Sequence, residues 1–299
     1  PPAQTNGHVR DNQFPAIVQV PPPKLDASGP LSVIRMSPVG DIERTDTISI
    51  TFSAPMVPLT GQSASVANIP VIIEPKLPGK WRWLGTHTLI FESSKQLPKA
   101  SHYTVTIPKT WSSLTGQTFE KNRRFRFSTN RPKVVRSGPA SGPSKQTRQP
   151  WLYFKFDQDV VATEVEKRLY LTKQSKRLAI VRATAAQTKT ISASLPGFEM
   201  AEKKRWFIFR PATELASNTS YTASLRPGIA SLEGPRLSNQ TFTFSFRTYP
   251  PMTISRFRCG YRKTCYPTSS MVFNFSNPIE AETVTSGTIQ IQPPVKELE

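Results

Sequence analysis

Two stretches decide the fold of this chain, because they carry nearly the same text: LIFESSKQLPKASHYTV (89–105) and FIFRPATELASNTSYTA (207–223). The match continues at the same spacing of 118 residues into SSLTG (112–116) and ASLEG (230–234). The matching residues are Phe91, Leu97, Tyr103, Leu114 and Gly116 in the first copy, and Phe209, Leu215, Tyr221, Leu232 and Gly234 in the second. A repeat of this length has the size of a whole domain, so the chain is predicted to be an array of duplicated domains.

Both copies contain short segments in which apolar and polar residues alternate. In the first copy Ile48, Ile50 and Phe52 would share one strand face, while the other face carries hydroxyl groups. Leu152 and Phe154 begin a similar segment in the second copy. Such alternation is typical of antiparallel strands with one buried and one solvated face, and regularly spaced turn residues favour a sandwich. We therefore predict an all-β fold of tandem antiparallel β-sandwiches without a long amphipathic helix.

The repeat also predicts the domain organisation of the 299 residues. Phe156 follows Phe52 by only 104 positions, so the second copy is expected to have gained a loop around 173–200. The text MVFNFSNP (271–278) echoes ITFSAP (50–55) and indicates a third copy. The predicted segments are an extended leader (1–31), β-sandwich 1 (32–131), β-sandwich 2 (132–250) and the start of a truncated β-sandwich 3 (251–299). Further elements are expected as strands at 16–20 and 289–291 and as short helices at 63–68 and 163–171.

The chain is strongly basic, with a formal net charge of +19. Between Pro132 and Thr248 there are 19 Lys and Arg residues against 8 Asp and Glu. The charge could attract an anionic partner such as nucleic acid, lipid headgroups or acidic polysaccharide, or it could serve solubility alone. The longest basic run is 203–205, and no aromatic stacking motif accompanies it, so we predict no specific nucleic-acid partner.

Cys259 and Cys265 are the only two cysteines. A zinc site would need two further ligands, and a redox pair would normally read Cys-x-x-Cys. A short-loop structural disulfide between them fits better and implies an oxidising compartment, although two unpaired buried thiols would also fit. No apolar stretch approaches the roughly 20 residues needed to cross a bilayer. The chain begins at Pro1 without Met, so we read it as a fragment that meets a membrane only through an anchor outside it.

The sequence offers little material for catalysis. Its histidines are His8, His87 and His102, and the positions 118 residues after the last two are Arg205 and Ser220. A histidine that is not kept between copies favours a surface role over a catalytic one. We expect no catalytic residue, no cofactor site and no metal site, and therefore no enzyme.

Two local patterns have competing interpretations. Asp157 and Asp159 could be a carboxylate pair or calcium ligands, but their place at a strand end favours a turn feature. Trp81 and Trp83 would lie on one strand face, either as an aromatic platform for sugar or a partner protein, or as part of the core. The core interpretation is favoured, because a sandwich of this length needs large buried residues.

The first copy resembles the amino-terminal region of bacterial alpha-2-macroglobulin-like proteins. The stretches that carry the resemblance are ITFSAPMVPL (50–59), WRWLGTHTLIF (81–91), Leu97-Pro98 with Tyr103, and FST (127–129), followed in the third copy by Cys259, Cys265-Tyr266-Pro267 and Phe275-Ser276. The resemblance implies tandem Ig-like, macroglobulin-type sandwiches at the front of a larger protein. That family inhibits proteases by being cleaved in a bait region, changing shape and trapping the attacker.

Many family members also carry a thioester within a Cys-Gly-Glu-Gln motif. This chain has Cys259-Gly260-Tyr261-Arg262 instead, so no functional residue is carried over. The resemblance implies a non-catalytic scaffold segment of a bacterial endopeptidase inhibitor that is periplasmic or lies in the cell envelope or outside the cell. Its partners would be proteases, through the full-length protein, and other envelope proteins. The alternative is an Ig-like stalk of a cell-surface, S-layer or adhesin protein.

Overall fold

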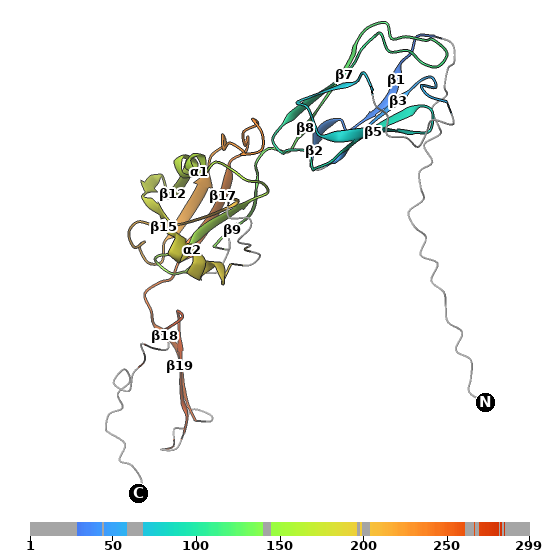
Figure 1. The fold of residues 1–299 in the computed structure, drawn as a ribbon. Coiled ribbons are helices and arrows are strands. Elements are labelled where there is room, and N and C mark those ends of the chain that lie inside the picture. Colours follow the sequence, from blue (N-terminus) through green and yellow to red (C-terminus); the bar gives the residue numbers. More distant parts are fainter. Residues whose placement is uncertain are drawn as a thin grey trace, which may run out of the picture. The chain divides into compact units, whose positions relative to one another are not determined.

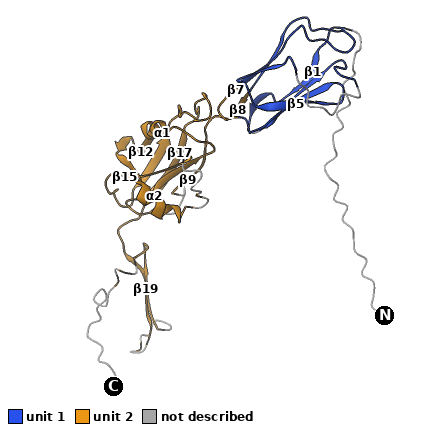
Figure 2. Cartoon of the chain, viewed as in Figure 1, with its two compact units in different colours: residues 1–97, 103–127 blue, residues 98–102, 128–299 orange. Residues whose placement is uncertain are grey.

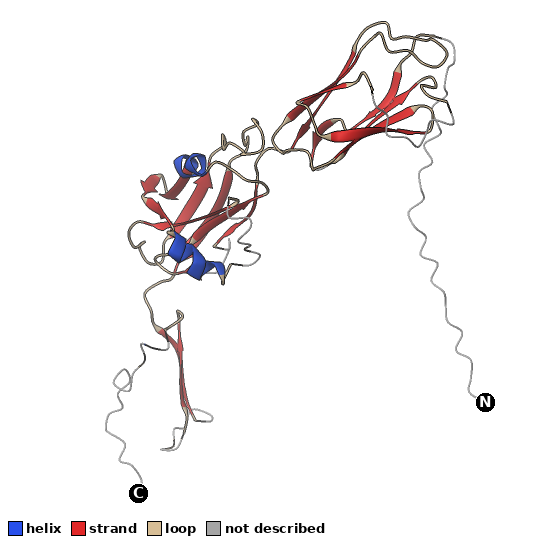
Figure 3. Cartoon of the chain, viewed as in Figure 1, coloured by secondary structure: helices blue, strands red, loops and turns tan. Residues whose placement is uncertain are grey.

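The structure is a computed structural model that describes residues 29–43, 45–58, 68–139, 145–195, 198, 204–260, 266, 269–280, 282 and 284. Strands dominate the described chain, and helices are few and short (Figures 1 and 3). The chain divides into two compact units, residues 1–97 with 103–127 and residues 98–102 with 128–299 (Figure 2). The predicted all-β class is confirmed. The domain boundaries after residues 31, 131 and 250 stay predictions.

Unit 1 is built on two four-stranded sheets, with strand orders β1-β3-β6-β5 and β2-β8-β7-β4. The alternation read from the sequence is the pattern of burial, since Ile48, Ile50 and Phe52 are all completely buried. They pack with Tyr103 and Phe127 from the opposite sheet in one apolar core. The strands are β1 (Val33–Ser37), β2 (Gly40–Ile42), β3 (Thr47–Phe52), β4 (Ile72–Glu74), β5 (Gly79–Leu84), β6 (Thr88–Ser93), β7 (His102–Ile107) and β8 (Arg123–Thr129).

Unit 2 repeats this plan with a four-stranded sheet, β14-β15-β11-β9, and a five-stranded sheet, β10-β17-β16-β12-β13. The duplication is visible in the bounds: β15 and β16 begin and end 118 residues after β6 and β7. All its described strand pairs are antiparallel except β10 with β17, which is parallel. The strands are β9 (Val134–Gly138), β10 (Lys145–Gln146), β11 (Leu152–Phe156), β12 (Leu169–Lys173), β13 (Lys176–Leu178), β14 (Ile180–Arg182), β15 (Trp206–Pro211), β16 (Ser220–Leu225) and β17 (Phe242–Thr248).

The insertion in the second copy is not the loop that the sequence predicted. It contains β13, β14 and the helix α2 (Ala185–Ser192). Ile191 of α2 packs with Trp206 and Ile208, which lie on the face of β15 turned away from the main core. Phe207 and Phe209 of the same strand enter the main core. The unbroken apolar run of β15 is therefore explained by burial on both faces of its sheet.

A second helix, α1 (Ala162–Arg168), precedes β12. The sequence predicted a helix over 163–171, and the last three of those residues are strand instead. Leu169 and Leu171 alternate into the core while Tyr170 points away from it, and this period of two selects the strand.

After unit 2's sheets, β18 (Ile254–Cys259) and β19 (Met271–Phe275) form a separate two-stranded antiparallel sheet. Its apolar side chains are largely uncovered, with Phe257 and Val272 each 51% exposed. The predicted elements at 16–20, 63–67 and 289–291 lie outside the described residues, and Asn68 is not helical. No helix in the described ranges is long and apolar enough to cross a membrane.

Candidate functional site: polar clasps at the strand ends

The same reciprocal pair of hydrogen bonds occurs three times in the part of the chain that the structure describes. In each pair the backbone N–H of the first residue donates to the side-chain oxygen of the second, at 2.9, 3.0 and 2.9 Å. The backbone N–H of the second donates back to the carbonyl of the first, at 3.0, 3.1 and 2.8 Å. The pairs are Ser32 with Ser53, Lys133 with Asp157, and Thr253 with Ser276. Each second residue directly follows a phenylalanine of β3, β11 or β19, so the short side chain at this position has a structural cause.

A buried threonine closes the last strand of each of the first two copies. Thr129 is 2% exposed, and its Oγ1 donates to the Pro98 carbonyl at 2.8 Å and accepts the Ser101 N–H at 3.0 Å. In the second copy Thr248 is completely buried and makes the same two bonds to Ala216 and Thr219, at 2.7 and 3.0 Å. We call these two arrangements the threonine clasps. Sequence reasoning missed them, although the text Phe-x-Thr at 127–129 and 246–248 is a usable signal.

The clasped turns share a backbone strain as well. Ala100 and Asn218, which are 118 residues apart, adopt positive φ angles of 52° and 51°. Asparagine tolerates this left-handed region, but alanine does so at a cost that its surroundings must offset. Ala100 is completely buried, and its N–H donates to the Asn130 carbonyl at 2.9 Å. The hydrogen bonds around it hold this conformation.

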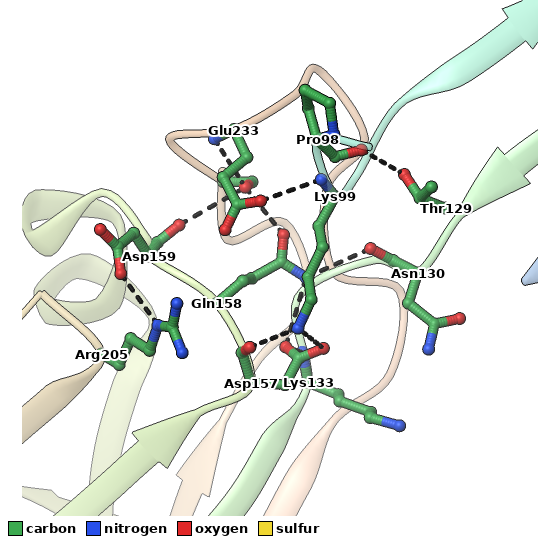
Figure 4. A network of polar contacts seen from close by, with 11 residues as sticks. Pro98, Lys99, Thr129, Asn130, Lys133, Asp157, Gln158, Asp159, Arg205 and Glu233 are labelled. Carbon is green, nitrogen blue, oxygen red and sulfur yellow. Dashed lines mark hydrogen bonds and ion pairs between the residues drawn. The ribbon is translucent and has the colours of Figure 1, made fainter. Parts of the chain in front are cut away.

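Residues 98–102 belong to unit 2, where Lys99 is held by charged groups (Figure 4). Its Nζ lies 2.5 Å from the Asp157 carbonyl and 3.6 Å from Asp157 Oδ2. Its backbone N–H donates to Glu233 Oε2 at 2.9 Å. The Asp157 side chain is only 10% exposed, so this pairing is better shielded from water than an ordinary surface salt bridge.

Two buried polar side chains complete this network. Gln158 is completely buried, and its amide donates to the Asn130 carbonyl at 3.2 Å and accepts from Ser231 Oγ at 2.8 Å. Arg236 is 6% exposed and donates from Nη1 to the Thr129 carbonyl at 2.6 Å. Breaking a hydrogen bond of a buried polar group is costly, so these contacts hold the segments they join.

The two glycines of the repeat are required for different reasons. A Cβ on Gly234 would lie 2.2 Å from Ser101 Oγ and 2.5 Å from the Lys99 and Ala100 carbonyl oxygens. Gly116 has open space around it but a φ of 79°. Gly234 therefore permits close backbone approach, and Gly116 permits a left-handed turn.

The residues considered for catalysis or metal binding lie in structural contacts. Asp159 accepts from Arg205 Nε at 3.0 Å. His87 Nδ1 lies 2.8 Å from Thr86 Oγ1, whereas the leader residue His8 lies outside the described residues. His102 Nδ1 likewise lies 2.8 Å from Ser128 Oγ. Across the described ranges no three His, Cys, Asp or Glu side chains could jointly hold a metal ion.

The tryptophan pair belongs to the packing of unit 1. Trp83 is 3% exposed, and the centre of its ring lies 6.1 Å from the centre of the Phe52 ring. Trp81 is half-buried, with 5.0 Å between its ring centre and that of Phe91. Arg82, between them, is bound to Glu92 at 2.6 Å. The contacts favour the core interpretation over the platform.

Cys259 is buried at the end of β18, and Cys265 lies outside the described residues. The disulfide between them stays a prediction.

A family model for the bacterial Ig-like domain matches this chain twice, over residues 27–129 and again over 128–248. The chain belongs to the bacterial Ig-like domain family. The first match ends at Thr129 and the second at Thr248, the residues of the two threonine clasps. The two threonine clasps are thus features of this chain's Ig-like domains.

The chain is also similar to parts of individual proteins. The chain is 22% identical over 306 residues to an alpha-2-macroglobulin homolog of Nostoc sp., covering 95% of this chain and 16% of that protein. Among solved structures, native alpha-2-macroglobulin from Escherichia coli, spanning domains MG0-NIE-MG1, matches 77% of this chain and 74% of its own at 16% identity and a TM-score of 0.24. An L,D-transpeptidase from Mycobacterium tuberculosis matches 52% and 60% at 15% identity and a TM-score of 0.25. The resemblance to bacterial alpha-2-macroglobulin-like proteins is confirmed, and the chain spans about a sixth of the Nostoc protein's length.

Proposed function

We propose that this chain is a non-catalytic, amino-terminal scaffold segment of a bacterial alpha-2-macroglobulin-like protein that inhibits endopeptidases by trapping them. The observation that carries the proposal is the similarity to the Nostoc alpha-2-macroglobulin homolog over 95% of this chain. The bait region and any thioester would lie outside this sequence. The protein would act in the bacterial periplasm or cell envelope, with proteases as partners of the full-length protein.

The repeated contacts support a scaffold role for this segment. The bonds that recur from copy to copy include the threonine clasps of Thr129 and Thr248, in which a side-chain hydroxyl binds backbone groups. They stabilise turns rather than position a reactive group. Neither His87 nor His102 has a histidine counterpart 118 residues on. The duplicated domains share contacts that stabilise the fold but do not share side chains that could act in catalysis. This pattern supports a scaffold role.

The proposal is tested by mixing the full-length protein with an endopeptidase and following cleavage of a labelled protein substrate. We expect the full-length protein to suppress cleavage and residues 1–299 alone to leave it unchanged. Full cleavage in the presence of the full-length protein would contradict inhibition and favour the alternative, a cell-surface stalk of Ig-like modules. Suppression by residues 1–299 alone would contradict the scaffold role.

A further inference from the structure

One face of unit 2 has an unusual composition. The five strands β10, β17, β16, β12 and β13 contain no Asp or Glu, and their outward positions carry Lys145, Arg177 and Arg247. The register places hydroxyl side chains side by side on the face away from the core: Tyr170 with Ser224 and Thr243, and Thr172 with Thr222 and Ser245. This outer face therefore combines hydrogen-bonding groups with positive charge only.

Two arginines are held together on this face by one aromatic ring. The guanidinium carbon of Arg177 lies 3.6 Å from the centre of the Tyr170 ring, and that of Arg226 lies 4.6 Å from it. Both arginines are exposed, and neither has an acidic partner in the described part of the chain. Stacking on tyrosine orders a guanidinium without neutralising it, so the pair is ready to bind an anion.

The arginines border a shallow depression of about 410 Å³. Its lining includes Thr172, Ser224 and Thr241, which add hydroxyl groups to the guanidinium groups of the two arginines. Thr222 Oγ1 and Ser245 Oγ are hydrogen-bonded to each other at 2.9 Å beside it. Guanidinium groups and hydroxyl groups together suit a ligand that carries both anionic groups and hydroxyls.

The acidic side chain in the first turn of α1, the helix that precedes β12, does not offset this charge. Glu164 of α1 forms ion pairs with Lys167 and Arg168, and Arg168 also donates to the Pro227 carbonyl at the edge of the depression. The hydrogen bond from Lys167 and the nearby Arg168 charge hold the pKa of Glu164 below its ordinary value. Its carboxylate is thus already neutralised by its own helix.

We propose that this face, centred on Tyr170, Arg177 and Arg226, binds an acidic polysaccharide through its carboxylate or sulfate groups. Nucleic acid fits less well, because single-stranded bases stack on free aromatic faces and the Tyr170 ring is flanked by two guanidinium groups. A membrane surface fits less well, because interfacial binding needs apolar side chains to insert and the outward positions of β12 and β16 are Tyr, Thr and Ser. The proposal does not depend on the protease-inhibitor function.

The test measures binding of the full chain to polygalacturonate and to heparin by titration calorimetry at low salt. The double variant Arg177→Ser/Arg226→Ser should bind about tenfold more weakly, because it loses the charge-assisted bonds. The matched control Arg124→Ser/Arg126→Ser removes the same charge from exposed positions of β8 and should change affinity by less than about twofold. Circular dichroism melting checks that both variants fold.

Two results would overturn the proposal. Equal weakening by both double variants would mean diffuse attraction by net charge, and binding of DNA or anionic phospholipid vesicles without either polysaccharide would mean a different partner. If the serine variant does not fold, Arg177→Lys/Arg226→Lys keeps the charge but loses the stacked, planar groups. It should bind several-fold more weakly than the unmodified chain, whereas unchanged affinity would contradict a built site.

Discussion

Replacing Thr129 by valine tests the threonine clasp with almost no change in volume. The substitution removes the bond to the Pro98 carbonyl at 2.8 Å and leaves the buried N–H of Ser101 without the oxygen that accepts it at 3.0 Å. Each hydrogen bond contributes about 0.5–1.5 kcal/mol net, so removing both should lower the free energy of opening the clasp by about 1–3 kcal/mol. This corresponds to a roughly 5- to 150-fold shift in the local opening equilibrium.

The loss can be measured by hydrogen exchange and mass spectrometry on peptides that cover residues 98–102, together with denaturant unfolding. Thr129→Val should accelerate exchange there by about 5- to 150-fold if opening is local. Thr104→Val is the matched control, because this half-buried threonine of β7 makes no side-chain hydrogen bond to any described residue. Thr248→Val should lower the free energy of opening its own clasp by the same amount as Thr129→Val, within about 0.5 kcal/mol, because the two clasps have the same geometry. Unchanged exchange and stability in Thr129→Val, or an equal loss in the control, would refute the reasoning.

Three further predictions follow from packing and from the cysteines. Gly116→Asn should lower the free energy of unfolding by less than about 1 kcal/mol, because asparagine accepts a positive φ. Gly234→Asn should lower it by about 1–3 kcal/mol or more, because the new side chain overlaps neighbouring atoms. Equal melting temperatures of the two variants would contradict this distinction. Ile208→Ala should cost about 2–5 kcal/mol in urea unfolding, because it leaves a cavity beneath α2, and a loss below about 1 kcal/mol would mean that this layer is not packed. The unfolded chain should react with a thiol label only after reduction if Cys259 and Cys265 form a disulfide, and labelling of both without reductant would exclude it.

The main features of the fold could be predicted from the sequence because duplication and alternation report directly on strands. The alternating residues Ile48, Ile50 and Phe52 form a fully buried strand face. The spacing of 118 residues separates the bounds of β6 from those of β15, and the bounds of β7 from those of β16. The sequence predicts a loop for the insertion, and this prediction is wrong, because the segment contains two strands and a helix. Its helix α2 is short, and its evidence lies in another segment, the apolar run of β15 that α2 covers.

The candidate site was less predictable for a similar reason. Asp157 was recognised as a strand-end feature, but its partner Lys99 is 58 residues away and no local pattern joins them. Arg236 gives no signal either, because nothing in its local sequence distinguishes a buried arginine from a basic surface residue. Contacts between distant segments depend on the tertiary fold, and a single sequence without a repeat at those positions does not reveal them.

The central proposal is that this chain is a scaffold segment of a protease-trapping protein, and the most direct measurement compares two substrates of different size. An endopeptidase incubated with the full-length protein is assayed on a large protein substrate and on a short chromogenic peptide. A trap that encloses the protease should block cleavage of the large substrate while activity on the peptide persists. If adding the full-length protein leaves the activity on the large substrate unchanged, or lowers the activity on both substrates by the same factor, the result contradicts trapping.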